Sequence, residues 1–313
     1  MTGPANPSHG DPHPPMAAVR EAVARALAED LLPVGDLSAM LVSSDARATA
    51  QLVCRAAGVL AGRDCAAEAF AQVDASVDLD WLLNDGESVV PGTVIATISG
   101  PLRPILTTER TALNFLCHLS GVASLTRSFV EAARAVNPTI RILDTRKTTP
   151  GLRALEKAAV RAGGGVNHRG SLSEGVLVKD NHLGGVSISQ AVATAAGLWP
   201  GRLIEVECDR LDQVAEAAAA GASVVMCDNM SPAQVGECVA LLTKSSDSCC
   251  SSPPKMWTTA TAGSVGRPLV EVSGGVCLEN VASYAAAGAD LISVGALTHS
   301  APSLDIGLDL VGS

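Results

Sequence analysis

The chain has 313 residues, of which 47% are hydrophobic, 17% charged and only 2% aromatic. Its length suits an α/β barrel of roughly 200–250 residues or two smaller domains. The net charge of −10 and the scarcity of aromatic side chains argue against nucleic acid and against an anionic membrane as partners.

Residues 1–15 are rich in Pro and predict a disordered tail rather than a secretory signal, because no basic segment precedes an apolar one. No apolar run reaches the length of about 18 residues that predicts a membrane span. The nine cysteines are odd in number, and none is spaced as CxxC. Such free thiols are typical of a reducing cytoplasm and argue against a structural zinc site.

The first predicted domain is of the α+β type and spans 16–128. Apolar residues at helical spacing predict helices over 16–31 and 62–72. Short apolar runs separated by turn residues predict two strands within 77–100.

A long helix is predicted from Thr107 to the Asn137-Pro138 pair, which is a strong stop signal. We expect it to break near Gly121, since glycine weakens a helix interior. This helix leads from the first domain into the next part of the chain.

Beyond Pro138, short apolar runs alternate with Ala-rich helical stretches, several of which end in Gly. Alternation of this kind predicts a parallel sheet with right-handed crossovers. The expected fold is a parallel α/β barrel, TIM-like and incomplete, over 129–299, with the C-terminal tail 300–313 packed on the α+β N-terminal domain. The six predicted strands are 140–144, 175–180, 202–207, 223–228, 269–275 and 291–296.

The segment 244–267 interrupts this rhythm. It is rich in Ser, Thr and Pro and has no periodicity, which predicts a flexible surface insertion. Its vicinal Cys249-Cys250 pair is interpreted as exposed thiols rather than as a redox or metal site.

Charged and Gly-rich positions follow the predicted strands where each one ends. Working residues of α/β barrels lie at the C-terminal ends of the strands. Here the first two ends carry cations, the next two carboxylates and the last two Gly-rich turns. In that order the residues are Arg146 and Lys147, Lys179, Glu207, Asp228, Ser273-Gly274-Gly275, and Gly295.

These residue types predict a pocket for a polyanion. Arg and Lys bind carboxylates and phosphates, paired carboxylates beside cations suit Mg²⁺ or ribose hydroxyls, and Gly-rich turns let backbone N–H groups approach a phosphate. The sequence therefore predicts a site for a Mg²⁺-bound sugar phosphate and a carboxylated partner molecule.

Several long motifs closely resemble the quinolinate phosphoribosyltransferase family. The resemblance covers the chain from about Met16 to Leu310. The motifs are GDLS (35–38), TERTALNFL (108–116), LDTRKTTPGLRALEKAAVRAGGGVNHR (143–169), VKDNH (178–182), EVEC (205–208), CDNM (227–230), EVSGG (271–275) and ISVGALTHSAPSLDIGLDL (292–310).

The resemblance implies transfer of phosphoribosyl from phosphoribosyl pyrophosphate to quinolinate with loss of CO₂, giving nicotinate mononucleotide. It implies catalytic roles for Lys147, Glu207 and Asp228, with Glu207 and Asp228 also placing Mg²⁺. It also implies a homodimer, or a hexamer of such dimers, with shared active sites. The implied quinolinate ligands are Arg146, His168, Arg169 and Lys179, with Arg110 from a second subunit. The implied phosphoribosyl pyrophosphate ligands are Lys147, Glu207, Asp228, Ser273, Gly274, Gly275 and Gly295.

Three other functions stay open at this point. A related phosphoribosyltransferase would act on nicotinate or another anionic base, although three arginines favour a dicarboxylate. A barrel lyase would form a Schiff base at Lys179. A non-catalytic binder would keep only the phosphate site.

The other polar residues are interpreted as having no direct part in binding or catalysis. We expect His118 to be structural, His182 to cap or orient its neighbours, and His299 to have no role. Helical spacing predicts a solvated face that carries Arg153, Lys157 and Arg161.

Overall fold

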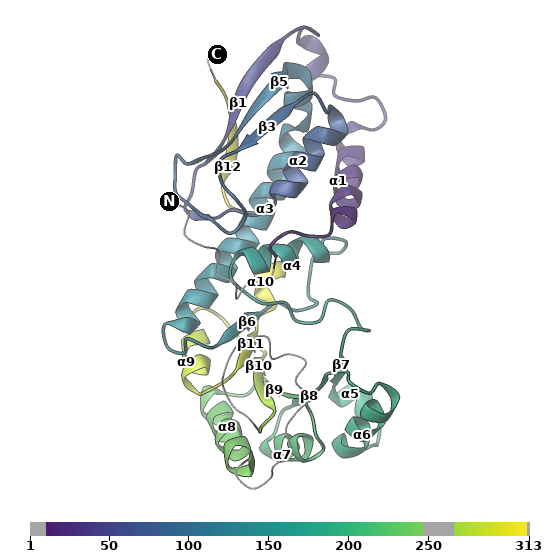
Figure 1. Cartoon of the computed structure of the whole chain (residues 1–313), viewed down its shortest axis with the longest axis vertical. Coiled ribbons are helices and arrows are strands. Elements are labelled where there is room, and N and C mark those ends of the chain that lie inside the picture. Colours follow the sequence, from purple (N-terminus) through teal and green to yellow (C-terminus); the bar gives the residue numbers. More distant parts are fainter. Residues whose placement is uncertain (1–10, 247–265, 312–313) are drawn as a thin grey trace. The chain divides into compact units, whose positions relative to one another are not determined.

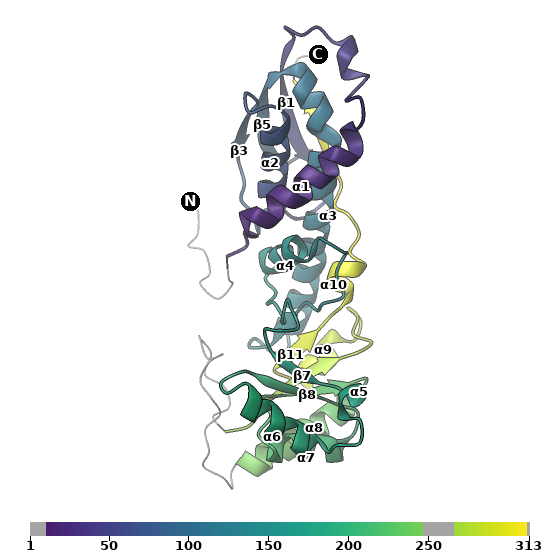
Figure 2. The ribbon, with the colours of Figure 1, turned by 90° about the vertical axis from the view of Figure 1, so that its right-hand side faces the viewer.

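The computed structural model describes residues 11–246 and 266–311. The chain divides into two compact units (Figures 1 and 2). Unit 1 comprises Met1–Arg127, Lys147–Val166 and Ala296–Ser313, and unit 2 comprises Ser128–Arg146 and Asn167–Gly295. Each unit is described by itself.

Unit 1 is built on an antiparallel sheet in the order β12-β1-β5-β3. These strands span Ile306–Leu310 (β12), Arg47–Cys54 (β1), Val94–Pro101 (β5) and Asp78–Trp81 (β3). The C-terminal strand β12 pairs with β1, so residues distant in sequence share one sheet. A separate two-stranded sheet joins β2 (Gly58–Val59) to β4 (Ser88–Val89).

Strand β1 was not among the predicted elements. Its buried positions alternate from Ala50 to Leu52 and Cys54, as expected for a strand with one covered face. Because this strand contains Ala and Thr at several positions, its buried and exposed residues differ too little in hydrophobicity for the alternation to be recognised.

The helices of unit 1 confirm the two N-terminal predictions. Helix α1 covers Met16–Leu31 and packs against α2, Arg63–Val73. The remaining helices are the one-turn η1 (Ala39–Leu41), α3 (Leu102–Arg134), whose residues beyond Arg127 belong to unit 2, α4 (Arg153–Ala162) and α10 (Ala296–His299).

The predicted break of the long helix near Gly121 is wrong, because α3 is continuous across this position. A Cβ atom at Gly121 would lie 2.1 Å from the carbonyl oxygen of Pro302. Glycine is present there because the backbone leading to β12 passes directly over the helix, and not because the helix ends.

Unit 2 contains a six-stranded sheet in the order β6-β11-β10-β9-β8-β7, and every described pair in it is parallel. The sheet is open between its edge strands β6 and β7, which confirms an incomplete α/β barrel (Figure 1). All six predicted strands are present. The strands are β6 (Arg141–Leu143), β7 (Val176–Val178), β8 (Ile204–Cys208), β9 (Val224–Asp228), β10 (Leu269–Ser273) and β11 (Leu291–Ser293).

Helices connect these strands as the βαβ pattern requires. Helix α6 begins with a capping box in which the Ser187 side chain accepts from the backbone N–H of Gln190. None of the described helices is long and apolar enough to cross a membrane. The helices of unit 2 are α5 (Asp180–Leu183), α6 (Ile188–Leu198), α7 (Leu211–Ala219), α8 (Pro232–Ser246) and α9 (Val281–Ala286).

Three segments bear on the expected domain limits. Residues 147–166, expected within the barrel domain, cluster with unit 1 because α4 contacts α1 and α10. In the N-terminal segment, the backbone oxygens of Asp11 and His13 accept hydrogen bonds from Arg161 at 2.5 and 3.0 Å. Most of the predicted insertion, including Cys249 and Cys250, lies outside the described residues.

Substituting Gly121→Ala should destabilise the protein by about 1–3 kcal/mol, because the added methyl group meets the Pro302 carbonyl. Denaturant unfolding measures this change. Gly197→Ala in α6 is the matched control, since a Cβ there meets nothing within 4 Å, and it should leave stability unchanged or raise it by up to about 1 kcal/mol. Equal effects of the two substitutions would contradict this explanation.

Candidate active site

The parallel register of unit 2 places predicted site residues at the same edge of its sheet. Asp228 at the end of β9 is paired with Ser273 at the end of β10. Glu207 lies opposite Met226 on β9, so it is near the same end of β8. The carboxylates and the Gly-rich turn therefore come together as expected for strand ends in a barrel.

Lys179 follows β7 directly and pairs with Glu207 of the neighbouring strand. Its Nζ atom donates to Oε2 of Glu207. The side chains are 41% and 17% exposed, so the pair faces solvent. A protonated, ion-paired lysine is a poor Schiff-base nucleophile, and this contact argues against the lyase alternative.

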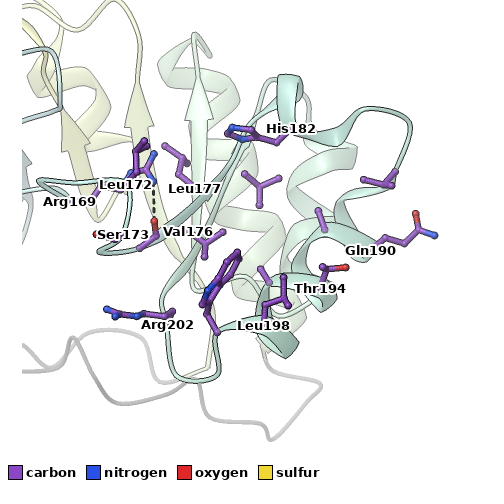
Figure 3. Close-up of a pocket in the computed structure, with 16 residues that line it drawn as sticks. Arg169, Leu172, Ser173, Val176, Leu177, His182, Gln190, Thr194, Leu198 and Arg202 are labelled. Atoms are coloured by element: carbon purple, nitrogen blue, oxygen red, sulfur yellow. Dashed lines mark hydrogen bonds between the residues drawn. The ribbon is translucent and has the colours of Figure 1, made fainter.

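Arg146 and Arg169 bring two positive charges into unit 2. Burial lowers the pKa of Arg169, and the charge of Arg146 lowers it further. Arg169 donates to the Gly175 carbonyl oxygen at 2.9 Å, which fixes its side chain (Figure 3). Two guanidinium groups that repel each other form a site that an anion would stabilise.

His168 is held in a buried polar cluster. Its backbone N–H donates to Oδ1 of Asp144 at 2.9 Å, and its Nε2 atom lies 3.0 Å from Oε2 of Glu205. Oε1 of Glu271 lies 3.7 Å from the same nitrogen. The histidine expected to bind substrate is thus fixed at both its backbone and its ring.

The two glutamates of this cluster have altered acidity. Burial raises the pKa of Glu205 to about 7 and that of Glu271 to about 8. Sequence reasoning missed both residues. The signal that could have found them is a carboxylate in the interior of each apolar strand, Glu205 in IEVEC and Glu271 in LVEVS, because a buried charged side chain requires a partner.

The turn after β10 has the geometry expected of a phosphate loop. Gly274 has φ +89° and Gly275 has φ +62°, values that favour glycine. A Cβ at Gly274 would lie 2.2 Å from Oδ1 of Asn229. Asn229 in turn donates through Nδ2 to Asp228 at 2.6 Å, so this glycine lets the asparagine hold the carboxylate.

The remaining predicted site residues are Gly295, Lys147 and Arg110. Gly295 follows β11 at the end of unit 2. Lys147 is exposed and begins a unit 1 segment, where its carbonyl oxygen accepts from Oγ1 of Thr298 at 2.8 Å. Arg110 is exposed on α3 in unit 1.

The structural roles predicted for His118 and His182 are confirmed, and the predicted solvated face of α4 is partly wrong. His118 forms a structural contact with Glu156, with its Nε2 2.9 Å from Oε1, and His182 accepts from the Lys179 backbone N–H at 3.0 Å. The predicted solvated face is wrong at Lys157, which is only 7% exposed. Helix α4 is buried at every position from Leu155 to Val160, so helical spacing alone did not identify its exposed side.

An apolar cavity of about 830 Å³ lies between β7 and α6 in unit 2 (Figure 3). Its walls include Leu177, Leu198 and Trp199, while Arg169 and His182 contribute polar groups. Leu198 and Trp199 are 62% and 51% exposed. Solvent-exposed apolar side chains around a cavity are typical of an interaction surface.

Comparison with known proteins identifies the family. Residues 36–120 match the model of the quinolinate phosphoribosyl transferase N-terminal domain, and residues 122–309 match that of its C-terminal domain. The chain belongs to the quinolinate phosphoribosyl transferase family. This confirms the family expected from the motifs.

Individual relatives agree along nearly the whole chain. The nicotinate-nucleotide pyrophosphorylase [carboxylating] of Mycobacterium leprae is 39% identical over 303 residues, covering 94% of this chain and 97% of the relative. A probable nicotinate-nucleotide pyrophosphorylase [carboxylating] of Bacillus subtilis is 38% identical, covering 88% of each. The solved nicotinate-nucleotide pyrophosphorylase of Francisella tularensis superposes with a TM-score of 0.84 at 34% identity, covering 96% of this chain and 98% of that one.

The buried Glu271 should make stability depend on pH. Its pKa in the folded protein is raised above the ordinary value of 4.5 to about 8. Between these two pH values the unfolded chain releases a proton that the folded protein keeps, so stability falls as pH rises through this range. Relative to wild type, Glu271→Gln should gain about 1–3 kcal/mol in unfolding free energy as pH rises from about 5 to about 8. Urea unfolding across this pH range tests the prediction, and a constant difference between the two proteins would contradict it.

Proposed function

We propose that this chain transfers phosphoribosyl from phosphoribosyl pyrophosphate to quinolinate, with loss of CO₂, to give nicotinate mononucleotide and pyrophosphate. The observation that carries this proposal is the arrangement of unit 2, where cations follow the first two strands and carboxylates the next two. Membership of the quinolinate phosphoribosyl transferase family supports the same reaction, which belongs to NAD biosynthesis.

Quinolinate carries two carboxylates, and the cations of unit 2 match this charge. Burial lowers the pKa of Arg169 and the charge of Arg146 lowers it further, so a bound dicarboxylate would relieve the repulsion between the two guanidinium groups. Lys179 and His168 complete the set, with Arg110 supplied by a second subunit. Nicotinate has a single carboxylate and would leave part of this positive charge uncompensated.

The sugar phosphate occupies the other half of the proposed site. Glu207 and Asp228 accept hydrogen bonds from the ribose hydroxyls, while Lys147 neutralises charge on the pyrophosphate. Backbone N–H groups of the turn Ser273–Gly275, together with Gly295, hold the 5′-phosphate. The left-handed conformations of Gly274 and Gly275 support this close approach.

The reaction needs positioning and charge stabilisation more than acid–base chemistry. The pyridine nitrogen of quinolinate is itself the nucleophile, and it attacks the anomeric carbon as pyrophosphate departs. Glu207 and Asp228 stabilise the positive charge that develops on the ribose. The C–C bond to the adjacent carboxylate then breaks, CO₂ departs, and the electron pair stays on the ring carbon, where the neighbouring cationic nitrogen stabilises it. A proton from solvent replaces the carboxylate on that carbon, while Arg and Lys side chains hold the ring.

Mg²⁺ fits the proposed donor set. Glu207 and Asp228 offer hard carboxylate oxygens at the ends of the adjacent strands β8 and β9, and such ligands suit Mg²⁺ directly or through water. When bound together with phosphoribosyl pyrophosphate, the ion supplies charge neutralisation to the leaving group.

The proposed assembly is a homodimer, or a hexamer of such dimers, with shared active sites in the cytoplasm. Arg110 is exposed on α3, as a residue that reaches a second subunit must be. The exposed apolar side chains beside β7 support an interface. The seven described cysteines are all free thiols, which supports a reducing compartment.

Release of labelled CO₂ from quinolinate tests the proposed reaction. Release should require both phosphoribosyl pyrophosphate and Mg²⁺, and mass spectrometry should show nicotinate mononucleotide as the product. Formation of that product from nicotinate, with no CO₂ from quinolinate, would assign the chain to the related phosphoribosyltransferase instead. Absence of turnover with either base would indicate a binding protein.

Arg146→Ala and Lys179→Ala should each raise the KM for quinolinate at least about tenfold, since a hydrogen bond to a charged group contributes about 1.5–3 kcal/mol. Glu207→Gln should instead lower kcat, by about a hundredfold, because its charge matters most in the transition state. Steady-state kinetics separates the two effects. The control is Arg202→Ala, because Arg202 is exposed and precedes the opposite end of β8. Wild-type kinetics for Arg146→Ala would refute the proposed anion pocket.

A shared active site predicts complementation between subunits. Arg110→Ala and Lys147→Ala chains should each be nearly inactive alone, because every site in such an assembly lacks one group. Mixed dimers, formed by co-expression with two different tags, should regain up to about half of the wild-type sites, since one site then holds both intact residues. No recovery in purified mixed dimers would place Arg110 outside the partner's site.

A further inference from the structure

A buried histidine–carboxylate cluster lies in the core of unit 2, beneath the proposed quinolinate pocket. The side chains of His168, Glu205 and Glu271 are 13%, 4% and 2% exposed. Nε2 of His168 contacts Oε2 of Glu205 at 3.0 Å, and Ser293 donates to Oε1 of Glu271. The proposed mechanism gives neither glutamate a part, and burying two carboxylates is costly.

The cluster is better explained by a retained proton than by a metal ion. Its three potential ligand atoms lie within 4.8 Å of one another, but His168 and Ser293 already occupy oxygens of the two glutamates. Burial raises the pKa of Glu205, and burial together with the charge of Glu205 raises that of Glu271. Two carboxyl groups so close together and so deeply buried favour a proton on one of them.

These contacts determine how His168 presents its ring. The backbone N–H of His168 is held by Asp144, which also accepts from Asn167 at 2.5 Å. The carboxylate of Glu205 keeps a hydrogen on Nε2 and directs that nitrogen toward the strands. A quinolinate carboxylate can only accept a hydrogen bond, so His168 would bind it as the imidazolium, with Nε2–H donating to Glu205 and Nδ1–H to the substrate.

We propose that Glu205, supported by Glu271 and Ser293, is a positioning residue that fixes the imidazole of His168 for contact with a quinolinate carboxylate. This inference rests on the proposed function. Glu205 acts through His168 and does not itself touch the substrate, so its contribution should appear in quinolinate affinity and should depend on the presence of His168.

A double-mutant cycle tests this dependence. Glu205→Met removes the acceptor at similar volume and should raise the KM for quinolinate about tenfold, with the KM for phosphoribosyl pyrophosphate changed by less than about twofold. In a His168→Ala background, the same substitution should change the quinolinate KM by less than about twofold. A full tenfold effect in that background would overturn the proposal, because Glu205 would then act independently of His168.

Two further variants separate positioning from general destabilisation. Glu205→Gln keeps one oxygen for His168 and can turn its amide nitrogen toward Glu271, so it should restore the quinolinate KM to within about threefold of wild type. Asp85→Leu removes a half-buried acceptor in unit 1, where Asp85 receives the Gly62 N–H at 3.0 Å. It should lower stability and leave the quinolinate KM within about twofold of wild type. An equal rise in KM for Asp85→Leu would favour a merely structural role for Glu205.

A spectroscopic measurement decides the question if Glu205→Met does not fold. In ¹⁵N spectra of the wild-type protein at neutral pH, with His168 assigned by the signal lost in His168→Ala, Nε2 should carry a hydrogen. A ring without hydrogen on Nε2 would overturn the proposal. Wild-type CO₂ release is measured in the same preparations, so failure of the proposed function is distinguished from failure of this inference.

Discussion

The proposed active site depends on the parallel register of the six strands in unit 2. Parallel pairing sets all the strand ends at one edge, and in this chain those ends carry Lys179, Glu207, Asp228 and the Gly274-Gly275 turn. These residues are separated by up to about a hundred positions in sequence, and no local structure would assemble them. The incomplete barrel thus provides a rigid edge on which groups of opposite charge are kept within reach of each other.

Electrostatics in this unit is arranged to favour anionic ligands. Burial and the nearby positive charge of Arg146 both disfavour the charged form of Arg169. A bound anion would offset this unfavourable free energy. The carboxylates of this unit differ in how deeply they are buried. Glu207 and Asp228 are partly exposed at the edge, whereas Glu205 and Glu271 lie in the core, where burial raises the pKa of both carboxyl groups. In the proposed site, the exposed carboxylates therefore contact the sugar phosphate, whereas the buried ones support His168.

The sequence predicted the periodic features of the molecule well. Six strands, helices α1 and α2, and the strand-end residues followed from apolar periodicity and from the rule for barrel sites. Features that depend on tertiary contact were missed or wrong. The long helix was expected to break near Gly121, but this glycine permits the close approach of Pro302, and Lys157 is buried. Glu205 and Glu271 escaped notice because their hydrogen-bond partners are distant in sequence: His168 lies 37 positions from Glu205, and Ser293 lies 22 positions from Glu271.

The central claim is that the cations of unit 2 recognise two carboxylates on one pyridine ring. Isothermal titration of the wild-type enzyme with quinolinate and with nicotinate tests it most directly. The account predicts that quinolinate binds at least about tenfold more tightly, since a second charged hydrogen-bonded group contributes about 1.5–3 kcal/mol. Equal affinity for the two pyridines would contradict the account.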